Sequence, residues 1–297
     1  MRRRLFLSAL FGCAALVIAP LRAVAAASCP ADGVVHLGLI PGEDTPTIMS
    51  VYKPISEELS RRLGCPVQLS IATSYTATIE AMRSKKLDIA TFGPLSYVLA
   101  HRVAGAEAMV APGHDDGTPS TYEATIVTPR SSGITSVRDL AGHSFAFSDP
   151  ASTSGHLMPA YALRKAGIDP NTGVRPFFAG SHTASFEALR NHKVDAGEVN
   201  SQLIRIATAA GSYDPNDFVT LWRSGPLPGS PMTIRADLPA AFKKRVREAV
   251  MSLDLRSIPD PQHVLSGTRY VGVKDSAYDG IRDMVSTLGI DLEHLGE

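Results

Sequence analysis

The chain has 297 residues, 44% hydrophobic and 20% charged, and its 29 Lys and Arg residues balance 29 Asp and Glu residues. This composition argues against intrinsic disorder, a collagen-like repeat, a coiled coil and a sequence-independent nucleic-acid binder, which needs a basic excess. Three cysteines are too few for a disulfide-rich scaffold or an iron–sulfur protein.

The first segment has the plan of a secretory signal peptide. Arginines at 2–4 precede an apolar run from 5 to about 20, and small residues follow at 23–27. The run is shorter than the ~20 residues of a membrane-spanning helix, so we predict a cleaved signal peptide at 1–26 and a periplasmic protein rather than a membrane anchor. Cleavage removes four arginines and no acidic residue. The mature chain is then mildly acidic and must hold any anion by local geometry.

Two cysteines remain after removal of the signal, which carries Cys13. Cys29 and Cys65 each precede a strand-like run. If those strands are parallel neighbours, the two cysteines lie at the same sheet edge, and we predict a Cys29–Cys65 disulfide in an oxidising compartment. The alternative is a lipoprotein cysteine at Cys29, which is disfavoured because the preceding residues lack the usual leucine.

Strands and helices alternate through the first half of the mature chain. Apolar β-prone runs predict strands at 34–40, 67–72, 87–91 and, more weakly, 108–111. Helical spacing predicts helices at 52–63, 76–86 and 95–104, with glycines as stops after the first and third. Such alternation is typical of βαβ units around a mainly parallel sheet.

A polar break at 113–119 and a long β-prone segment at 122–128 precede a second alternating region. Its predicted helices are 137–140, 153–166, 183–192 and 202–210, and its predicted strands are 144–148, 174–178, 194–199 and 218–222. A loop at 224–231 contains three prolines and two glycines, and helices at 239–253 and 278–288 complete the chain.

The restart of the pattern after a polar break predicts an α/β fold of two lobes. Lobe one would comprise 27–120 and 224–297, and lobe two 121–223. The segments 122–128 and 218–222 would cross between the lobes, and the last helices would return to lobe one. The alternative is one continuous doubly wound sheet.

The most informative stretch joins a strand end to a helix start and contains three consecutive hydroxyl residues, Ser152, Thr153 and Ser154. Ligands of open α/β lobes bind beyond the carboxyl ends of the strands. The first N–H groups of a helix have no intrahelical partner and attract anions. We therefore predict a site of neutral donors for a tetrahedral oxyanion; the alternative is a plain N-cap, which also prefers serine or threonine.

Other polar residues follow other strand ends. Tyr75 and His182 each offer a donor, and Glu198 and Asn200 lie where the strand at 194–199 closes. These positions allow side chains of both lobes to converge on one cleft. A half-buried tyrosine and a surface histidine are equally good interpretations of Tyr75 and His182.

Enzyme patterns fit poorly. The sequence contains no G-x-S-x-G elbow, no P-loop and no H-E-x-x-H motif, and its histidines are scattered. Ser152 and His182 imitate a nucleophile and a base, but the sequence marks no third member. We predict no catalytic residues, no cofactor and no metal site.

Several motifs together resemble the substrate-binding proteins of ABC importers for phosphonate and related phosphorus oxyanions, which are two-lobed type II periplasmic binding proteins. The resemblance covers about 34–288. It is carried by Ser74-Tyr75, by F-G-P-L-S-Y at 92–97, by D-P-A-S-T-S-G at 149–155, by Gly180-Ser181-His182 and by K-V-D-A at 193–196.

The resemblance implies a ligand site. Ser152, Thr153 and Ser154 would hold the phosphorus-bound oxygens, Tyr75 and His182 would complete the shell, and Tyr122 at the crossover would line the cleft. Family members that bind aminoalkylphosphonates hold the amine with carboxylates. Glu198 lies near one such region, but Asn200 stands where a second acid is expected, which puts an aminated ligand in doubt. Phosphite, methylphosphonate and phosphate stay open.

The predicted function is capture of a phosphorus oxyanion by hinge closure and delivery to the membrane permease of an ABC importer, by a monomer or weak dimer that binds no nucleic acid. Two alternatives stay open: an exported sensor module for the same anion, and an exported Ser-dependent phosphoesterase.

Overall fold

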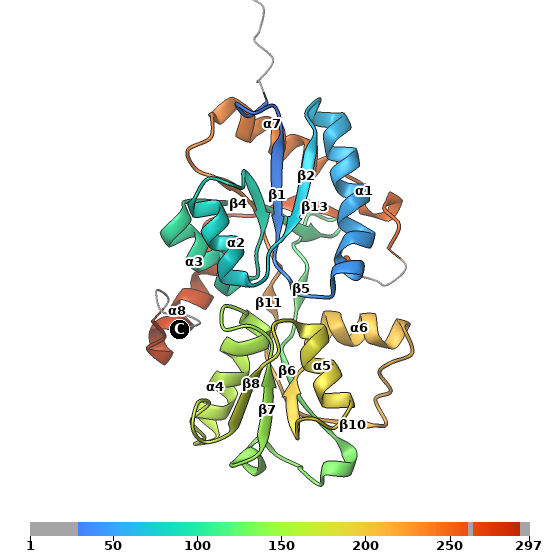
Figure 1. Cartoon of the computed structure of the whole chain (residues 1–297), viewed down its shortest axis with the longest axis vertical. Helices are drawn as coiled ribbons and strands as arrows, with labels where there is room; N and C mark the ends of the chain where they lie inside the picture. Colours follow the sequence, from blue (N-terminus) through green and yellow to red (C-terminus); the bar gives the residue numbers. More distant parts are fainter. Residues whose placement is uncertain (1–28, 261–263, 292–297) are drawn as a thin grey trace, which may run out of the picture.

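The computed structural model describes residues 29–260 and 264–291, so the predicted signal peptide at 1–26 lies outside the described residues. Two α/β lobes are stacked along the long axis of the molecule, each built on its own sheet (Figure 1). We define lobe one by the six-stranded sheet, in the order β13-β4-β12-β3-β1-β2, and lobe two by the five-stranded sheet, in the order β10-β6-β9-β7-β8. The single continuous sheet is therefore excluded.

Lobe one contains the strands β1 (Val35–Leu39), β2 (Val67–Ile71), β3 (Ile89–Thr91), β4 (Ala106–Gly113), β12 (Met232–Arg235) and β13 (Arg269–Gly272). Its helices are α1 (Thr45–Leu63), α2 (Tyr75–Arg83), α3 (Pro94–Ala104), α7 (Ala240–Met251) and α8 (Asp279–Leu288). The C-terminal helices return to this lobe as predicted, because α7 packs on α1 and α8 on α3. Hydrophobic clusters fill the spaces between this sheet and its helices.

Lobe two contains the strands β6 (Thr125–Pro129), β7 (Ser144–Phe147), β8 (Arg175–Phe178), β9 (Ala196–Glu198) and β10 (Phe218–Arg223). Its helices are α4 (Met158–Lys165), α5 (His182–Arg190) and α6 (Ser201–Ala209), and a short π-helical segment at Thr153–Leu157 leads into α4. None of the described helices has the length and apolarity that a membrane span requires.

The sheets are mixed, so the prediction of mainly parallel sheets needs correction. The predicted βαβ units exist, since β1 pairs in parallel with β2 and β3, and β7 with β8 and β9. However, the chain that returns from lobe two forms β12, which inserts antiparallel between β3 and β4. The sequence did not predict β12 or β13, and β6 and β10 also run antiparallel to their neighbours.

The crossing between lobes is made by a two-stranded antiparallel pair, β5 (Thr121–Tyr122) with β11 (Leu227–Pro228). It lies between the two lobes in Figure 1. Tyr122 crosses as predicted, but 218–222 does not, because β10 pairs with β6 inside the lobe-two sheet. The return crossing is instead made by residues that the sequence predicted as the loop 224–231.

Helix α1 begins well before the predicted residue 52. Asp44 caps it, with Oδ1 accepting from the Thr47 N–H at 2.9 Å and Oδ2 from the Thr47 hydroxyl at 2.8 Å. Pro46 fits the first turn, where its missing N–H costs nothing. A second proline, Pro54, lies inside the helix, in both its predicted and its observed bounds.

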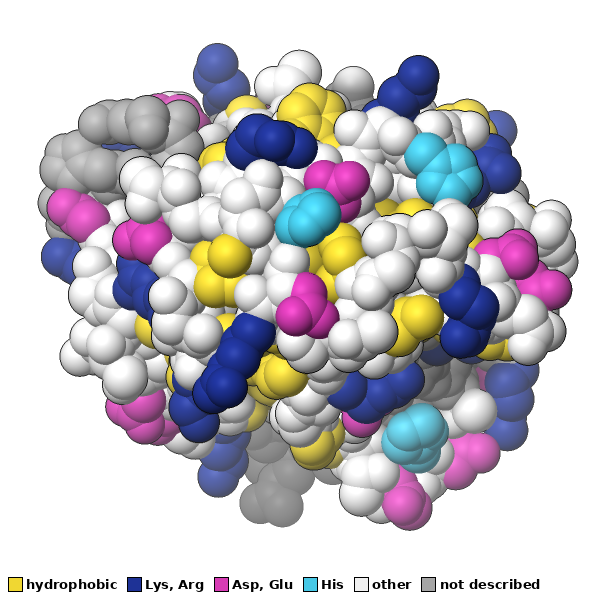
Figure 2. All heavy atoms as spheres, turned by 90° about the horizontal axis from the view of Figure 1, so that it is seen from below, with side chains coloured by type: hydrophobic (Ala, Val, Ile, Leu, Met, Phe, Trp, Pro, Cys, Tyr) yellow, Lys and Arg dark blue, Asp and Glu magenta, His cyan; other side chains and the backbone are white. Residues whose placement is uncertain are grey.

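The surface carries no single sign of charge where Figure 2 looks at the molecule from the lobe-two end. Lysine and arginine side chains are interspersed there with aspartate, glutamate and histidine side chains. Interspersed charges largely cancel beyond a Debye length of ~8–10 Å. An anion that reaches the protein must therefore be held by groups close to it.

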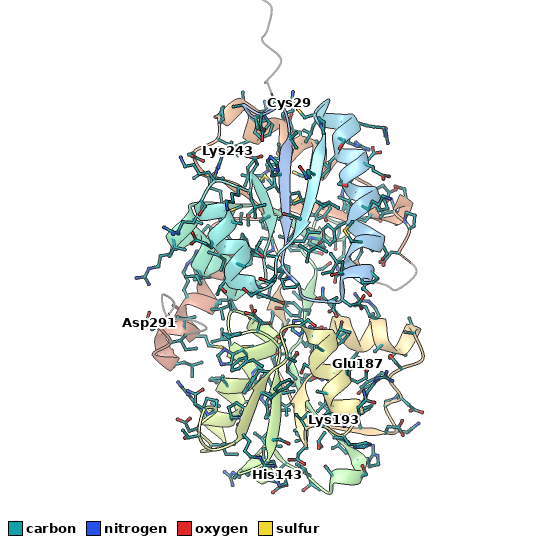
Figure 3. The ribbon with its side chains drawn as sticks, viewed as in Figure 1. Cys29, His143, Glu187, Lys193, Lys243 and Asp291 are labelled. Atoms are coloured by element: carbon teal, nitrogen blue, oxygen red, sulfur yellow. A yellow bond between two sulfur atoms is a disulfide. The ribbon has the colours of Figure 1, made fainter. Side chains whose placement is uncertain are left out.

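The predicted Cys29–Cys65 disulfide is confirmed, with the two Cα atoms 5.9 Å apart. The register of β1 and β2 explains it: Val35 pairs with Val67, so both strands begin at the same edge of the sheet. Figure 3 places Cys29 at the end of lobe one that points away from lobe two. The bridge therefore stabilises lobe one at its outer end.

Removing this bridge should destabilise the protein. The disulfide joins residues 36 apart in sequence, and closing a loop of that size contributes about 3–4 kcal/mol in the chain-entropy model. We expect a Cys29→Ser/Cys65→Ser double variant to melt roughly 10 °C lower by calorimetry. Reductant should lower the melting temperature of the wild type and leave that of the double variant unchanged; equal melting of all samples would contradict a stabilising bridge.

Candidate functional site

A cavity of about 140 Å³ lies between the two lobes, beside the crossing strands. Seven of the eight residues that the sequence predicted as a ligand site line it: Tyr75, Tyr122, Ser152, Thr153, Ser154, His182 and Asn200. They come from both lobes and from β5. The expectation that ligands bind beyond the carboxyl ends of the strands therefore identified side chains that the fold brings together from distant parts of the sequence. We call this expectation the strand-end rule.

The hydroxyl residues lie at the start of the helix that follows β7. Ser152 is the N-cap, and its Oγ accepts from the Gly155 N–H at 3.0 Å. The next turn is π-helical, with the Leu157 N–H bonded to the Ser152 carbonyl at 3.1 Å. All three hydroxyl residues are at most 2% exposed. A wide first turn of this kind is common at functional sites, and its first N–H groups have no intrahelical acceptor.

Gly155 lets this turn approach the end of β7. A Cβ atom there would lie 1.7 Å from Ser148 Oγ and 2.8 Å from Ser152 Oγ. The Ser148 hydroxyl is buried and has no hydrogen-bond partner among the described residues. The absence of a side chain at Gly155 therefore allows the hydroxyl cluster to form.

His182 is the first residue of α5 and joins the cluster from a second helix start. Its Nε2 lies 3.5 Å from Ser152 Oγ, and its Nδ1 lies 2.8 Å from Glu198 Oε1. Burial alone would lower the pKa of His182. The charge of Glu198 and its hydrogen bond outweigh that effect and raise the pKa to about 9. The raised pKa favours the imidazolium form at neutral pH, so the site adds a positive charge to the neutral donors that the sequence predicted.

Glu198 lies behind His182 and does not line the cavity. Its side chain is 0% exposed, and its Oε2 has no hydrogen-bond partner among the described residues. The carboxylate orients the imidazole ring and holds its proton. Ser152, His182 and Glu198 are thus arranged in a row of serine, histidine and acid. The sequence analysis did not identify Glu198 as the third member of this arrangement.

Asn200 lines the cavity from the start of α6. Its Oδ1 caps that helix by accepting from the Leu203 N–H at 2.9 Å. The amide is 2% exposed. A neutral side chain therefore occupies the position where a second carboxylate was considered.

Glu43 was missed by the sequence analysis. It follows β1, lines the cavity, and its Oε2 accepts from the Thr183 hydroxyl at 2.6 Å. Burial raises the pKa of Glu43 to about 7, against the opposing effect of the His182 charge. The same strand-end rule that indicated Tyr75 and His182 also applies to β1, and would have indicated Glu43.

Tyr75 and Tyr122 are neutral donors. Both are buried, at 2% and 6% exposure. Burial raises the pKa of Tyr122 to about 12 and that of Tyr75 well above its ordinary value. Each phenol therefore keeps its proton at physiological pH and can donate it to an anion.

Direct hydrogen bonds connect the lobes around the cavity. The Leu95 N–H, at the start of α3, donates to Thr153 Oγ1 at 2.8 Å, and the Tyr75 N–H, at the start of α2, donates to Asp149 Oδ2 at 3.2 Å. In the opposite direction, the His182 N–H donates to the Gly42 carbonyl at 2.8 Å. Donors at helix starts of each lobe are thus satisfied by acceptors of the other, so the lobes are closed on one another.

The cavity suits a small anion. Among the described residues, no lysine or arginine lines it, and no group of three histidine, cysteine, aspartate or glutamate residues is arranged to hold a metal ion. Its donors are hydroxyls, helix-start N–H groups and one imidazolium. Such donors are the groups that bind phosphate-like oxyanions at helix N-termini.

Comparison with known proteins agrees with this geometry. A family model described as the periplasmic phosphonate substrate-binding protein of ABC transporters matches residues 37–279. The phosphate-import protein PhnD of Mycolicibacterium smegmatis is 27% identical over 276 residues, which cover 86% of each chain. The phosphonates-binding periplasmic protein of Escherichia coli is 26% identical over 226 residues, 74% of this chain and 66% of that protein.

A solved structure shows the same fold. PhnD1 from Prochlorococcus marinus, in complex with methylphosphonate, superposes with a TM-score of 0.76 at 23% identity, over 86% of this chain and 98% of that one. This likeness confirms the predicted type II periplasmic binding protein fold.

Gly155→Ala should damage the hydroxyl cluster. The added methyl overlaps Ser148 Oγ, and overpacking of this kind costs about 1–3 kcal/mol. We expect a corresponding loss of unfolding free energy in urea. Gly280→Ala in α8 is the control, because its Cβ meets nothing within 4 Å and alanine favours a helix. Equal stability of Gly155→Ala and wild type would show that the close approach is not required.

Proposed function

Because this chain belongs to the periplasmic phosphonate substrate-binding proteins of ABC transporters, we propose that it captures a phosphorus oxyanion in the interlobe cavity and delivers it to the membrane permease of an importer. Proteins of this family are periplasmic, and they bind substrate rather than transform it. The observation that carries the proposal is the cluster of hydroxyls and helix-start N–H groups at Ser152–Ser154, which faces donors of the other lobe.

The proposed ligand contacts follow from this arrangement. Ser152, Thr153 and Ser154 hold the oxygens by hydroxyl and N–H donors, and the Tyr75 and Tyr122 phenols donate from lobe one and from the crossing strand. The His182 imidazolium supplies the one full positive charge, while Glu198 acts through His182 as a positioning residue. Hydrogen bonds to a charged group contribute ~1.5–3 kcal/mol each, so a few of them give tight yet reversible binding.

Glu43 adds selectivity for protonation state. A carboxylate beside an anion is unfavourable, but the pKa of about 7 allows Glu43 to carry a proton when the ligand is doubly ionised. The protonated Glu43 carboxyl group then donates a hydrogen bond to the ligand. In its ionised form, the Glu43 carboxylate accepts a hydrogen bond from a singly protonated ligand. Both pairings leave one proton between the two groups, which admits phosphonates and hydrogen phosphate.

Capture is proposed to proceed by hinge closure. We assign lobe one to 27–120 and 224–297 and lobe two to 121–223, with β5 and β11 as the hinge. The Leu95–Thr153 and Tyr75–Asp149 hydrogen bonds across the cleft favour the closed form, which presents a continuous surface to the permease. A sensor module would use the same closure to signal to a receptor. That the protein is a monomer or a weak dimer stays a prediction.

Loss of the hydroxyl donors should weaken binding. We expect a Ser152→Ala/Thr153→Ala variant to bind methylphosphonate at least tenfold more weakly by calorimetry, since two donors to an anion are removed. Ser136→Ala is the control: it removes the capping hydroxyl of a short helix elsewhere in lobe two, and its affinity should equal that of the wild type. Unchanged affinity in the double variant would refute the proposed site.

Binding should also depend on the charge of His182. Because the folded pKa of His182 is raised to about 9, the contribution of its charge to the affinity should be fully present below that pH and be lost as the pH rises through it. Glu198→Gln removes the charge that sustains the imidazolium, so this loss should move to lower pH. Glu187→Gln is the control, because Glu187 lies on the same helix as His182 (Figure 3). It pairs instead with Arg190 at the surface. Titration of the ligand itself is common to all three proteins; identical pH profiles would exclude a role for the pair.

A further inference from the structure

The disulfide at the outer end of lobe one contacts an arginine. Arg245 lies on α7, which packs on α1. Its Nη2 donates to Cys65 Sγ at 3.3 Å, while its Nε is buried and has no hydrogen-bond partner among the described residues. No carboxylate in the described part of the chain forms an ion pair with Arg245, whose guanidinium lies over the Phe242 ring. A full positive charge therefore adjoins one sulfur of the bridge.

The two sulfur atoms of the bridge differ in their surroundings. Cys65 is 1% exposed, whereas Cys29 is partly exposed at the surface. Backbone carbonyl oxygens lie near both sulfurs: that of Leu63 is 3.5 Å from Cys65 Sγ. The Gly64 carbonyl oxygen is 3.8 Å from Cys29 Sγ. These partial negative charges act alike on the two sulfurs, so the contact with Arg245 and the difference in exposure are what distinguish them.

This asymmetry decides how a thiol would react with the bridge. A thiolate opens a disulfide by attacking one sulfur, and the other sulfur leaves as a thiolate. Burial blocks the approach to Cys65 and leaves Cys29 open to attack, so Cys65 is the leaving sulfur. A neighbouring arginine stabilises a thiolate, and arginine keeps its charge throughout the physiological pH range. The negative charge would thus develop beside a cation that no carboxylate of the described residues neutralises.

We propose that Cys29 is a site of thiol modification, at which an external thiol exchanges with the Cys29–Cys65 bridge, and that Arg245 is a positioning residue that directs the exchange. The sulfur of the attacking thiolate forms a bond to Cys29 Sγ. The Cys29–Cys65 bond breaks, and its electron pair stays on Cys65 Sγ as a thiolate. One disulfide replaces another, so the step needs no oxidant or reductant besides the thiol.

The modification site is separate from the interlobe cavity. Cys29 lies at the end of lobe one that points away from lobe two (Figure 3). Neither cysteine of the bridge lines the cavity, and Arg245 does not line it either. The inference therefore does not rest on the proposed function, and the two can fail independently.

Mapping the adduct of a small thiol tests which sulfur is attacked. The folded protein is mixed with excess reduced glutathione and quenched with acid, and its peptides are analysed by mass spectrometry. The described residues contain no cysteine other than Cys29 and Cys65. We expect glutathione on Cys29 in at least tenfold excess over Cys65. No adduct, equal amounts on both cysteines, or an excess on Cys65 would overturn the proposal.

The rate of bridge opening by dithiothreitol tests the role of Arg245. Arg245→Met keeps an unbranched side chain near Phe242 but removes the charge, and should slow opening in the folded protein at least threefold. Lys244→Met is the control, because it removes a positive charge from the next position of α7, where the Lys244 side chain is 77% exposed. The control should open at the rate of the wild type.

A loss of stability cannot imitate the slower opening, because unfolding exposes a buried bond and speeds its cleavage. Opening of Arg245→Met at the wild-type rate or faster would overturn the role of the arginine. A spectroscopic readout is independent of rates. In Cys29→Ser, where Cys65 is the one cysteine of the described residues, the ultraviolet absorbance of the thiolate at a fixed pH should fall when Arg245→Met is added. Unchanged absorbance would show that Arg245 does not stabilise the Cys65 thiolate.

Discussion

Unpaired N–H donors at helix starts are the constraint around which this molecule is organised. Helices α2, α3 and α5 and the helical turn at Thr153–Leu157 all begin at the cleft, because the strands before them end there. Donors gathered in a buried place must find acceptors. The opposite lobe supplies some, as in the Leu95–Thr153 bond, and a bound anion is proposed to supply the rest.

The buried His182–Glu198 pair adds charge where these donors meet. Removing two ions from water is costly unless their remaining hydrogen-bonding groups are satisfied. The Nε2 of His182 faces the hydroxyl cluster rather than a carboxylate, so its proton is available to a ligand. In the proposed function, this pair supplies the one full positive charge beside an anion in a cavity that no described lysine or arginine lines.

Much of this was predictable from sequence because strand ends and helix starts leave local signals. The hydroxyl run at Ser152–Ser154, Tyr75 and His182 each follow a β-prone segment, and the parallel strands after Cys29 and Cys65 indicated their bridge.

The return strands β12 and β13 were not predicted, because their pairing is set by contacts distant in sequence. The π-helical turn was not predicted for the same reason. Position 155 must be glycine because a Cβ there would overlap the Ser148 hydroxyl, and the helical pattern of the sequence does not reveal that contact. Glu43 and the charge on His182 depend on burial, which appears only when both lobes are assembled.

The most direct test of the central claim is an NMR titration of the isotope-labelled protein with methylphosphonate, followed at the backbone amides of Thr153 and Ser154. If these N–H groups bind the anion, their resonances should shift downfield more than those of other helix starts and their hydrogen exchange should slow. Saturable binding that leaves both amides unmoved would contradict the account.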